Sequence, residues 1–192
     1  MKLTLDQAHD YWKEPDNTNN APDYLKPVVR SKYLSGLFRQ ANIRPTMSIL
    51  ELGCNSGRNL NYFHHLGFNR LQGIDISQQA INCNPLYEVK RNCSCLSIED
   101  YYSLDNAPID VIFSMAVLMH LHPDSEWVFE KIVEQVHRWL VVVEYEGGQK
   151  MDRCWSRDYG NIFNQFGMRI LHQEIITGVS GLNNYTGYLF YK

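Results

Sequence analysis

The stretch 48–60, SILELGCNSGRNL, holds the residues whose types and spacing most clearly suggest chemistry. An apolar run leads into Glu51, then Gly53 and Gly57, then a polar segment suited to beginning a helix. A strand that turns into a helix at glycine leaves backbone N–H groups pointing into the space above the sheet, where a polar or anionic ligand can accept from them. Asn55 fits because asparagine tolerates the left-handed backbone conformation. A tight turn without a ligand is the alternative.

A second candidate is Asp75, which ends the next apolar run, 71–75. It follows the glycine turn by close to the roughly twenty residues expected for an acid that binds a ribose diol. The two oxygens of a carboxylate suit two adjacent hydroxyl groups. A helix N-cap or turn acid ahead of the segment ISQQAI is the alternative interpretation.

Apolar runs that alternate with helical patterns indicate a parallel sheet covered on both faces. We expect strands at 48–53, 71–75, 93–97, 109–114 and 140–145. We expect helices at 57–66, 77–83, 124–139 and 158–166, and a short turn at 99–103. In the helix 124–139, Asp124 is the expected N-cap, with Val136 and Trp139 among the apolar residues at helical spacing.

Both ends of the chain complete the predicted fold. Runs at 168–177 and 185–192, joined across GVSGLNN, predict a closing hairpin, and the proline-punctuated segment 1–46 contains a helical stretch at 28–43. The predicted fold is α/β: a doubly wound, mostly parallel seven-stranded sheet with a C-terminal antiparallel hairpin and an N-terminal helical cap. We expect one domain over 1–192, with the cap at 1–46 and the core at 47–192.

The length, charge and cysteine content of the chain limit the kinds of partner that we expect. A chain of 192 residues with 44% hydrophobic content fits one globular domain. Its five cysteines are odd in number and contain no C-x-x-C pair, so we expect reduced thiols and no metal. A net charge of −3 makes a long nucleic acid an unlikely partner. No apolar run is long enough to span a membrane and no signal peptide is apparent, so we expect a cytoplasmic protein. Oligomeric state is not readable from the sequence.

Four ordered segments carry a family resemblance: ILELGCNSGRNL, GIDIS, SIED and DVIFSMAVLMHLHP. Together they resemble the motif series of class I S-adenosylmethionine-dependent methyltransferases, over roughly residues 45 to 145, and the last helix and strands resemble the end of that fold. Asn55 departs from the commonest family loop, which has glycine there. The resemblance implies an enzyme that methylates an oxygen or nitrogen atom of a small or medium-sized acceptor, such as a sugar, metabolite or natural product, by direct displacement. A protein or tRNA acceptor stays open.

The resemblance also implies a set of residues that bind S-adenosylmethionine. The glycine loop would surround its methionine part, Asp75 would bind the ribose, and the segment 97–99 would reach the adenine, with Glu99 or Asp100 accepting from the amino group. The complete implied set is Glu51, Gly53, Cys54, Asn55, Gly57, Asp75, Ile76, Ser97, Ile98, Glu99 and Met115.

Residues for the acceptor follow from position at the carboxyl edge of the sheet, where ligands bind in such folds. His120, just after the fourth strand, is a candidate base, with a structural or pocket-lining role as the alternative, and Glu144 at the end of the fifth is a candidate to orient an acceptor. A structural role is the alternative for each of the remaining candidates, which are Tyr11, Trp12, Tyr24, Arg30, His122 and Arg157. Among these, Arg157 would bind an anionic acceptor and the aromatic residues of the cap would cover the site.

Two other functions remain as alternatives. One is a non-catalytic module that binds S-adenosylmethionine. The other is a nicotinamide-dependent oxidoreductase, which shares the strand, glycine turn and acid. Its usual loop is G-x-G-x-x-G, whereas this chain has Asn55 and Arg58, and the pair Tyr188 and Lys192 lies in a predicted strand. Methylation of an amino group of adenine or glutamine is disfavoured. The resemblance would place an N-P-P-Y motif after the fourth strand for that reaction, and this chain has SMAV there.

Overall fold

The computed structural model describes residues 3–14, 21–26, 28–147 and 152–192. Its strands are β1 (Ile49–Leu52), β2 (Leu71–Asp75), β3 (Cys93–Cys95), β4 (Ile109–Met115), β5 (Val136–Glu144), β6 (Arg169–Ile175) and β7 (Thr186–Tyr191). Its α-helices are α1 (Leu5–Lys13), α2 (Val28–Gln40), α3 (Arg58–His65), α4 (Gln78–Asn82), α5 (Tyr87–Lys90), α6 (Ile98–Tyr102), α7 (Trp127–Gln135) and α8 (Tyr159–Gln165). Three short 3-10 helices are η2 (Ala21–Leu25), η3 (Leu118–His120) and η4 (Pro123–Ser125).

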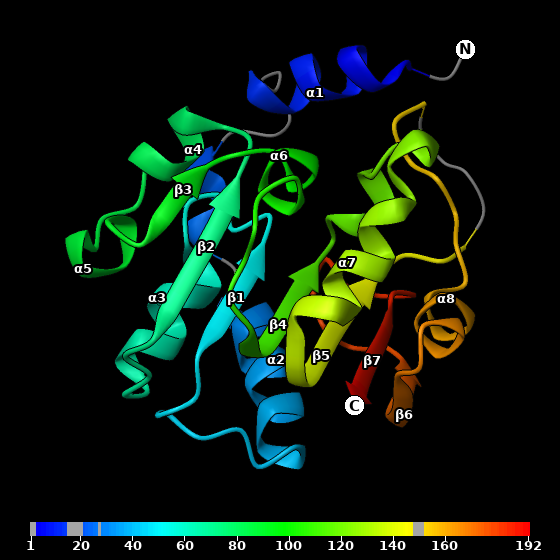
Figure 1. Ribbon diagram of the computed structural model, residues 1–192. Coiled ribbons are helices and arrows are strands. Elements are labelled where there is room, and N and C mark those ends of the chain that lie inside the picture. Colours follow the sequence, from blue (N-terminus) through cyan, green and yellow to red (C-terminus); the bar gives the residue numbers. More distant parts are fainter. Residues whose placement is uncertain (1–2, 15–20, 27, 148–151) are drawn as a thin grey trace.

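The seven strands form one sheet in the order β3-β2-β1-β4-β5-β7-β6 (Figure 1). The first five pair in parallel, whereas β7 runs antiparallel to both β5 and β6. The predicted mostly parallel sheet with a C-terminal antiparallel hairpin is therefore confirmed. Of the predicted cap, residues 1–2, 15–20 and 27 lie outside the described residues.

The helix predicted at 124–139 is wrong at both ends. The helix expected at 124–139 ends at Gln135, and β5 begins at Val136, four residues before the expected strand. Val136 and Trp139 pair with Ile109 and Val111 of β4 across a register irregularity. Pairing with a neighbouring strand thus overrides a pattern that also fits a helix, because β-branched and aromatic residues suit a buried strand. At the other end, Asp124 lies inside η4 and does not cap α7.

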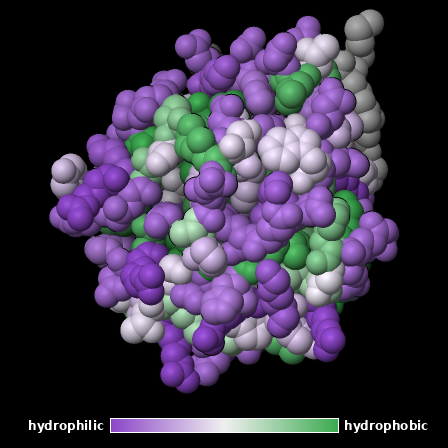
Figure 2. Space-filling view, viewed as in Figure 1, coloured by the Kyte–Doolittle hydropathy of each residue, from purple (hydrophilic) through white to green (hydrophobic). Residues whose placement is uncertain are grey.

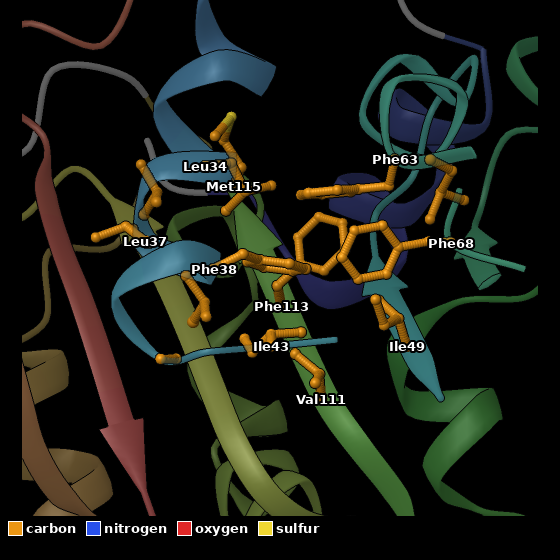
Figure 3. Close-up of a cluster of buried hydrophobic side chains, with 14 of the residues drawn as sticks. Leu34, Leu37, Phe38, Ile43, Ile49, Phe63, Phe68, Val111, Phe113 and Met115 are labelled. Carbon is orange, nitrogen blue, oxygen red and sulfur yellow. The ribbon is translucent and has the colours of Figure 1, made fainter. Parts of the chain in front are cut away.

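Two apolar cores lie on opposite faces of the sheet, because successive strand residues point to opposite sides. Ile49, Val111 and Phe113 face α2 and α3, whereas Leu50 and Ile112 face α6, α7 and α8. The first core contains an aromatic cluster (Figure 3). Its members are Phe38, Phe63, Phe68 and Phe113, with the Phe38 and Phe63 rings stacked at 4.3 Å. This packing fixes α2 and α3 against β1 and β4, the strands that carry the candidate site.

Helix α1 crosses the edge of the sheet to which the arrowheads of β1, β2 and β4 point (Figure 1). Thr4 begins it with a capping box: its side chain accepts from the backbone of Gln7, whose side chain accepts in return from the backbone of Thr4. The face seen in Figure 2 is mostly polar, with apolar residues in small groups. In the described ranges, no helix is long and apolar enough to cross a membrane.

Replacing Phe63 with alanine tests the aromatic core. The side chain is fully buried, so Phe63→Ala should lower the free energy of unfolding by about 3–5 kcal/mol through lost burial and a residual cavity. Phe166→Ala is the matched control, since that ring is 38% exposed at the end of α8, and it should cost less than about 1 kcal/mol. Chemical denaturation monitored by circular dichroism measures both, and equal losses would contradict the assignment.

Candidate active site

A cavity of about 480 Å³ opens at the carboxyl ends of β1, β2 and β4, with α1 along one side. The turn after β1 supplies its floor. Gly53 has φ +70° and Asn55 has φ 47°, so the backbone is left-handed at both positions. A Cβ at position 53 would overlap the side chain of Val117, which follows β4. Glycine is therefore required for the turns after β1 and β4 to approach each other.

Glu51 presents an unsatisfied carboxylate oxygen at this cavity. The side chain of Asn59 donates to its Oε1 at 2.7 Å, whereas its Oε2 is buried without a hydrogen-bond partner. Burial raises the pKa of Glu51 to about 8 from 4.5, and the bond from Asn59 lowers it only in part. A buried acceptor without a donor is costly, so this oxygen is suited to a ligand that brings an N–H group.

Asp75 lies at the end of β2 and holds the glycine turn in place. Its Oδ2 accepts from the backbone N–H of Asn55 at 2.8 Å, and its Oδ1 accepts from that of Ser77 at 2.9 Å. Burial raises the pKa of Asp75, and these two bonds act in the opposite direction. Each carboxylate oxygen can accept more than one bond, so both remain able to bind hydroxyl groups of a ligand.

The segment after β3 forms a further wall. Ser97 caps α6 by accepting from the backbone of Asp100 at 2.9 Å. Ile98 and Glu99 line the cavity, whereas Asp100 is exposed and is not a lining residue. The carboxylate of Glu99 accepts from Ser125 at 2.6 Å and pairs with His9 of α1 at 3.2 Å. This ion pair connects α1 to the body of the molecule.

The turn after β4 is fixed by Glu144, which is fully buried at the end of β5. Ala116 has φ 59°, a strained value for a residue with a side chain. The backbone N–H groups of Val117, Leu118 and Met119 all donate to the Glu144 carboxylate at 3.0–3.1 Å. Glu144 therefore stabilises the turn and is not among the residues that line the cavity.

His120 follows this turn and lines the cavity. Its Nδ1 lies 2.9 Å from the backbone oxygen of Arg153, which only accepts, so Nδ1 carries the proton. Burial lowers the pKa of His120 to about 4. The imidazole is thus neutral at pH 7, and its Nε2 is an acceptor without a partner in the described part of the chain. The ring of Trp12 packs on it at 4.4 Å between centroids.

The cavity brings together most residues that the sequence singled out. Those that line it are Glu51, Gly53, Cys54, Asn55, Asp75, Ile76, Ser97, Ile98, Glu99, Met115, His120, His122, Trp12, Tyr24 and Arg30. Gly57, Tyr11, Glu144 and Arg157 do not line it. The guanidinium of Arg157 instead donates to the backbone oxygens of Leu118 and Leu121, where it braces the segment after β4.

Among the polar residues that line the cavity, those that sequence reasoning missed include His9, Arg58, Arg153 and Tyr185. Arg58 was findable, because it follows the glycine turn directly. The others lie on α1, after β5 and between β6 and β7, and no local pattern marks their approach. Across the described residues, no group of three His, Cys, Asp or Glu side chains is placed to hold a metal ion.

Comparison with known proteins agrees with this geometry. Residues 50–141 match the family described as "Methyltransferase domain". A magnesium protoporphyrin IX methyltransferase from Synechocystis PCC 6803, solved with bound S-adenosylmethionine, is similar over 100% of this chain and 99% of its own, with a TM-score of 0.70 and 15% identity. The [4+2]-cyclase SpnF is similar over 100% and 97%, with a TM-score of 0.72 and 12% identity.

These findings support the prediction from the sequence: the chain resembles class I S-adenosylmethionine-dependent methyltransferases in its motifs over residues 50–141 and in its fold. One curated relative is the mitochondrial ubiquinone biosynthesis O-methyltransferase of Saccharomyces cerevisiae, which is 26% identical over 113 residues. That match covers 55% of this chain and 35% of the relative, so the chain spans about a third of the relative's length.

Changing Glu144 to glutamine tests its positioning role. The amide nitrogen would face backbone N–H donors, so Glu144→Gln should lower the free energy of unfolding by about 2–4 kcal/mol. Glu134→Gln, at an exposed position on α7, is the control and should change stability by less than about 1 kcal/mol. Urea denaturation measures both variants. Wild-type stability in Glu144→Gln would show that the carboxylate does not hold the turn.

The His9–Glu99 pair predicts a pH dependence for α1. The hydrogen bond to Glu99 raises the pKa of His9 above 6.5. Burial alone would raise the pKa of Glu99, but the hydrogen bonds from His9 and Ser125 outweigh burial, so this pKa lies below 4.5. The contribution from His9 is complete below pH 6.5 and is lost as pH rises through its raised pKa, whereas that from Glu99 is lost as pH falls below about 4.5.

Opening of α1 should therefore cost about 0.5–1 kcal/mol less at pH 8.5 than at pH 5.5. Amide hydrogen exchange in α1, corrected for the intrinsic rates, measures this difference, and α2 of the same sample is the control. His9→Gln should remove the pH dependence. An unchanged pH dependence in that variant would assign it to another group.

Proposed function

We propose that the protein transfers a methyl group from S-adenosylmethionine to an oxygen or nitrogen atom of a small or medium-sized acceptor by direct displacement. The observation that carries the proposal is the presence, in one cavity, of the unsatisfied Oε2 of Glu51 and the carboxylate of Asp75. The two acids lie at the ends of the adjacent strands β1 and β2. An amine and a vicinal diol in one ligand would satisfy both.

The residues present fit this cofactor. Glu51 would accept from the ammonium group of its methionine part, and Asp75 would accept from the ribose hydroxyls. Arg58 would bind the carboxylate of the methionine part, because this cation lies near Glu51, which would bind the neighbouring ammonium group. Arg58 begins α3 and donates to Met115 Sδ at 3.4 Å. Ile76 and Ile98 supply apolar surface for the adenine.

Bound S-adenosylmethionine supplies a methyl group on a sulfonium, which is an activated leaving group. The remaining demand on the protein is to align the acceptor and accept its proton. The Nε2 of His120 is suited to this because the bond from Nδ1 to the Arg153 backbone fixes the tautomer. A pKa of about 4 keeps the ring neutral at physiological pH and able to accept.

The cavity and the relatives both support a small-molecule acceptor. A cavity of about 480 Å³ and a net charge of −3 support a small molecule rather than a long nucleic acid. The names of the two methyltransferases reported above refer to small-molecule substrates, and one is an O-methyltransferase. Five free cysteines support a reducing, cytoplasmic location.

The similar cyclase gives a second candidate class, because this fold also carries a reaction other than methyl transfer. A non-catalytic module that binds S-adenosylmethionine is a third. Neither alternative predicts production of S-adenosylhomocysteine. Detection of S-adenosylhomocysteine across a panel of small acceptors therefore separates the proposed enzyme from either alternative.

Two substitutions separate binding from chemistry. Asp75→Ala should weaken S-adenosylmethionine binding by at least about tenfold, because it removes two charged acceptors and releases the glycine turn. His120→Ala should leave binding within about threefold and lower turnover by roughly 10²–10⁴-fold. Calorimetric titration with S-adenosylmethionine and, in parallel, NADH measures the first effect. Binding of NADH alone, or equal loss of binding in both variants, would overturn this division of roles.

A further inference from the structure

Three arginines line the cavity: Arg30 from α2, Arg58 from α3 and Arg153 from the segment after β5. Among the described residues, none of these three arginines forms an ion pair with a carboxylate. The arginines that do are Arg91, Arg138 and Arg157, which do not line the cavity. Burial raises the pKa of Tyr24, and the charges of all three arginines act against it, so the three guanidinium groups lie near this phenol. Positive charge is thus concentrated at one part of the cavity.

Arg30 is held by backbone rather than by an acid. Its Nε donates to the backbone oxygen of Ser180 at 3.2 Å. Its guanidinium lies against Gly181, where a Cβ would overlap it. Gly181 also has φ +77°, a left-handed conformation that favours glycine. Arg30 and Gly181 both line the cavity, and the charge of Arg30 acts on the nearby Tyr185.

Arg153 is held by aromatic rings. Its guanidinium lies 4.3 Å from the ring centre of Tyr11 and 5.9 Å from that of Trp12. Its Nε is buried without a hydrogen-bond partner. Its backbone oxygen accepts from His120, so the side chain begins directly beside the candidate base. A partly buried cation that forms no ion pair with a described residue is costly, which points to an anionic ligand.

Two arginines of the cavity have no anion to pair with once the charges of the cofactor are included. This step rests on the proposed function. Of the acids that line the cavity, Glu51 and Asp75 face the amine and ribose of the cofactor, and Glu99 is paired with His9. The carboxylate of the cofactor takes Arg58. No anion in the described residues or in the cofactor remains for Arg30 and Arg153.

We propose that the methyl acceptor is a small organic anion, and that Arg30 and Arg153 bind its carboxylate or phosphate group on the side of the cavity next to His120. The planar guanidinium of arginine matches either group with paired hydrogen bonds. Because the anion is bound at Arg153, the acceptor atom is directed to the neighbouring His120. Arg157, the arginine that the sequence suggested for this role, is occupied by backbone oxygens.

The test uses the protein saturated with S-adenosylhomocysteine and three probes of similar shape. Benzoate, phenyl phosphate and benzamide are titrated by calorimetry and ligand-observed nuclear magnetic resonance at constant ionic strength. At least one of the two anions should bind, and neutral benzamide should bind at least tenfold more weakly. The anion that binds more tightly distinguishes a carboxylate site from a phosphate site.

Variants assign the binding to the two arginines. Arg30→Gln and Arg153→Gln should each weaken anion binding roughly ten- to hundredfold and leave the affinity for S-adenosylhomocysteine within about threefold. Arg153→Lys, which keeps the charge, should restore part of the affinity. Arg39→Gln, at an exposed position on the same helix as Arg30, is the matched control and should bind as the wild type does. Thermal melting establishes that each variant is folded.

Three results would overturn the inference: no binding of either anion, equal binding of benzamide, or unchanged anion binding in both glutamine variants. Failure of the proposed function looks different. In that case S-adenosylhomocysteine itself does not bind, and the same titrations without it decide the anion site by the same criteria.

Discussion

The buried carboxylate of Glu144 is the interaction on which the arrangement of the site depends. It accepts from three successive backbone N–H groups just after the left-handed residue Ala116. These bonds offset the strain of the turn and set the direction in which the chain continues to His120. The same turn presents Val117 to Gly53, so the two loops of the cavity are fixed relative to each other. A carboxylate that does not itself line the cavity thereby sets the geometry of the groups that do.

The acids of the site fall into two classes that burial alone does not separate. Glu51 and Glu144 are both fully buried, yet Glu144 is satisfied by backbone and side-chain donors, whereas one oxygen of Glu51 has no donor. The satisfied acid stabilises the fold, and the unsatisfied one is suited to a ligand. Arg30 and Arg153 repeat this logic with the opposite sign, since a partly buried charge without an ion-pair partner among the described residues indicates where one is expected.

Helix α1 completes the cavity through contacts of modest strength. The ion pair of His9 with Glu99 and the bond from Ser77 to the backbone oxygen of Lys13 connect it to the α6 and β2 sides. Trp12 connects it to His120 on the β4 side. Such contacts are weaker than the interdigitated cores on the faces of the sheet, so α1 can open while the rest of the fold is retained.

The sequence by itself determined the sheet, its strands and the cofactor side of the cavity. Gly53, Asn55 and Asp75 belong to short segments whose backbone conformation is set by local residue type, and the alternation of strands and helices follows from local periodicity. The boundary at Val136 was missed because its pattern fits a helix as well as a strand, and pairing with β4 decides between them. Only the tertiary structure placed Glu144 beneath the loop and Arg157 behind it, and only it brought Arg30 and Arg153 to one cavity. These side chains come from segments far apart in the chain, and their roles depend on which donors, acceptors and charges the fold leaves without a partner.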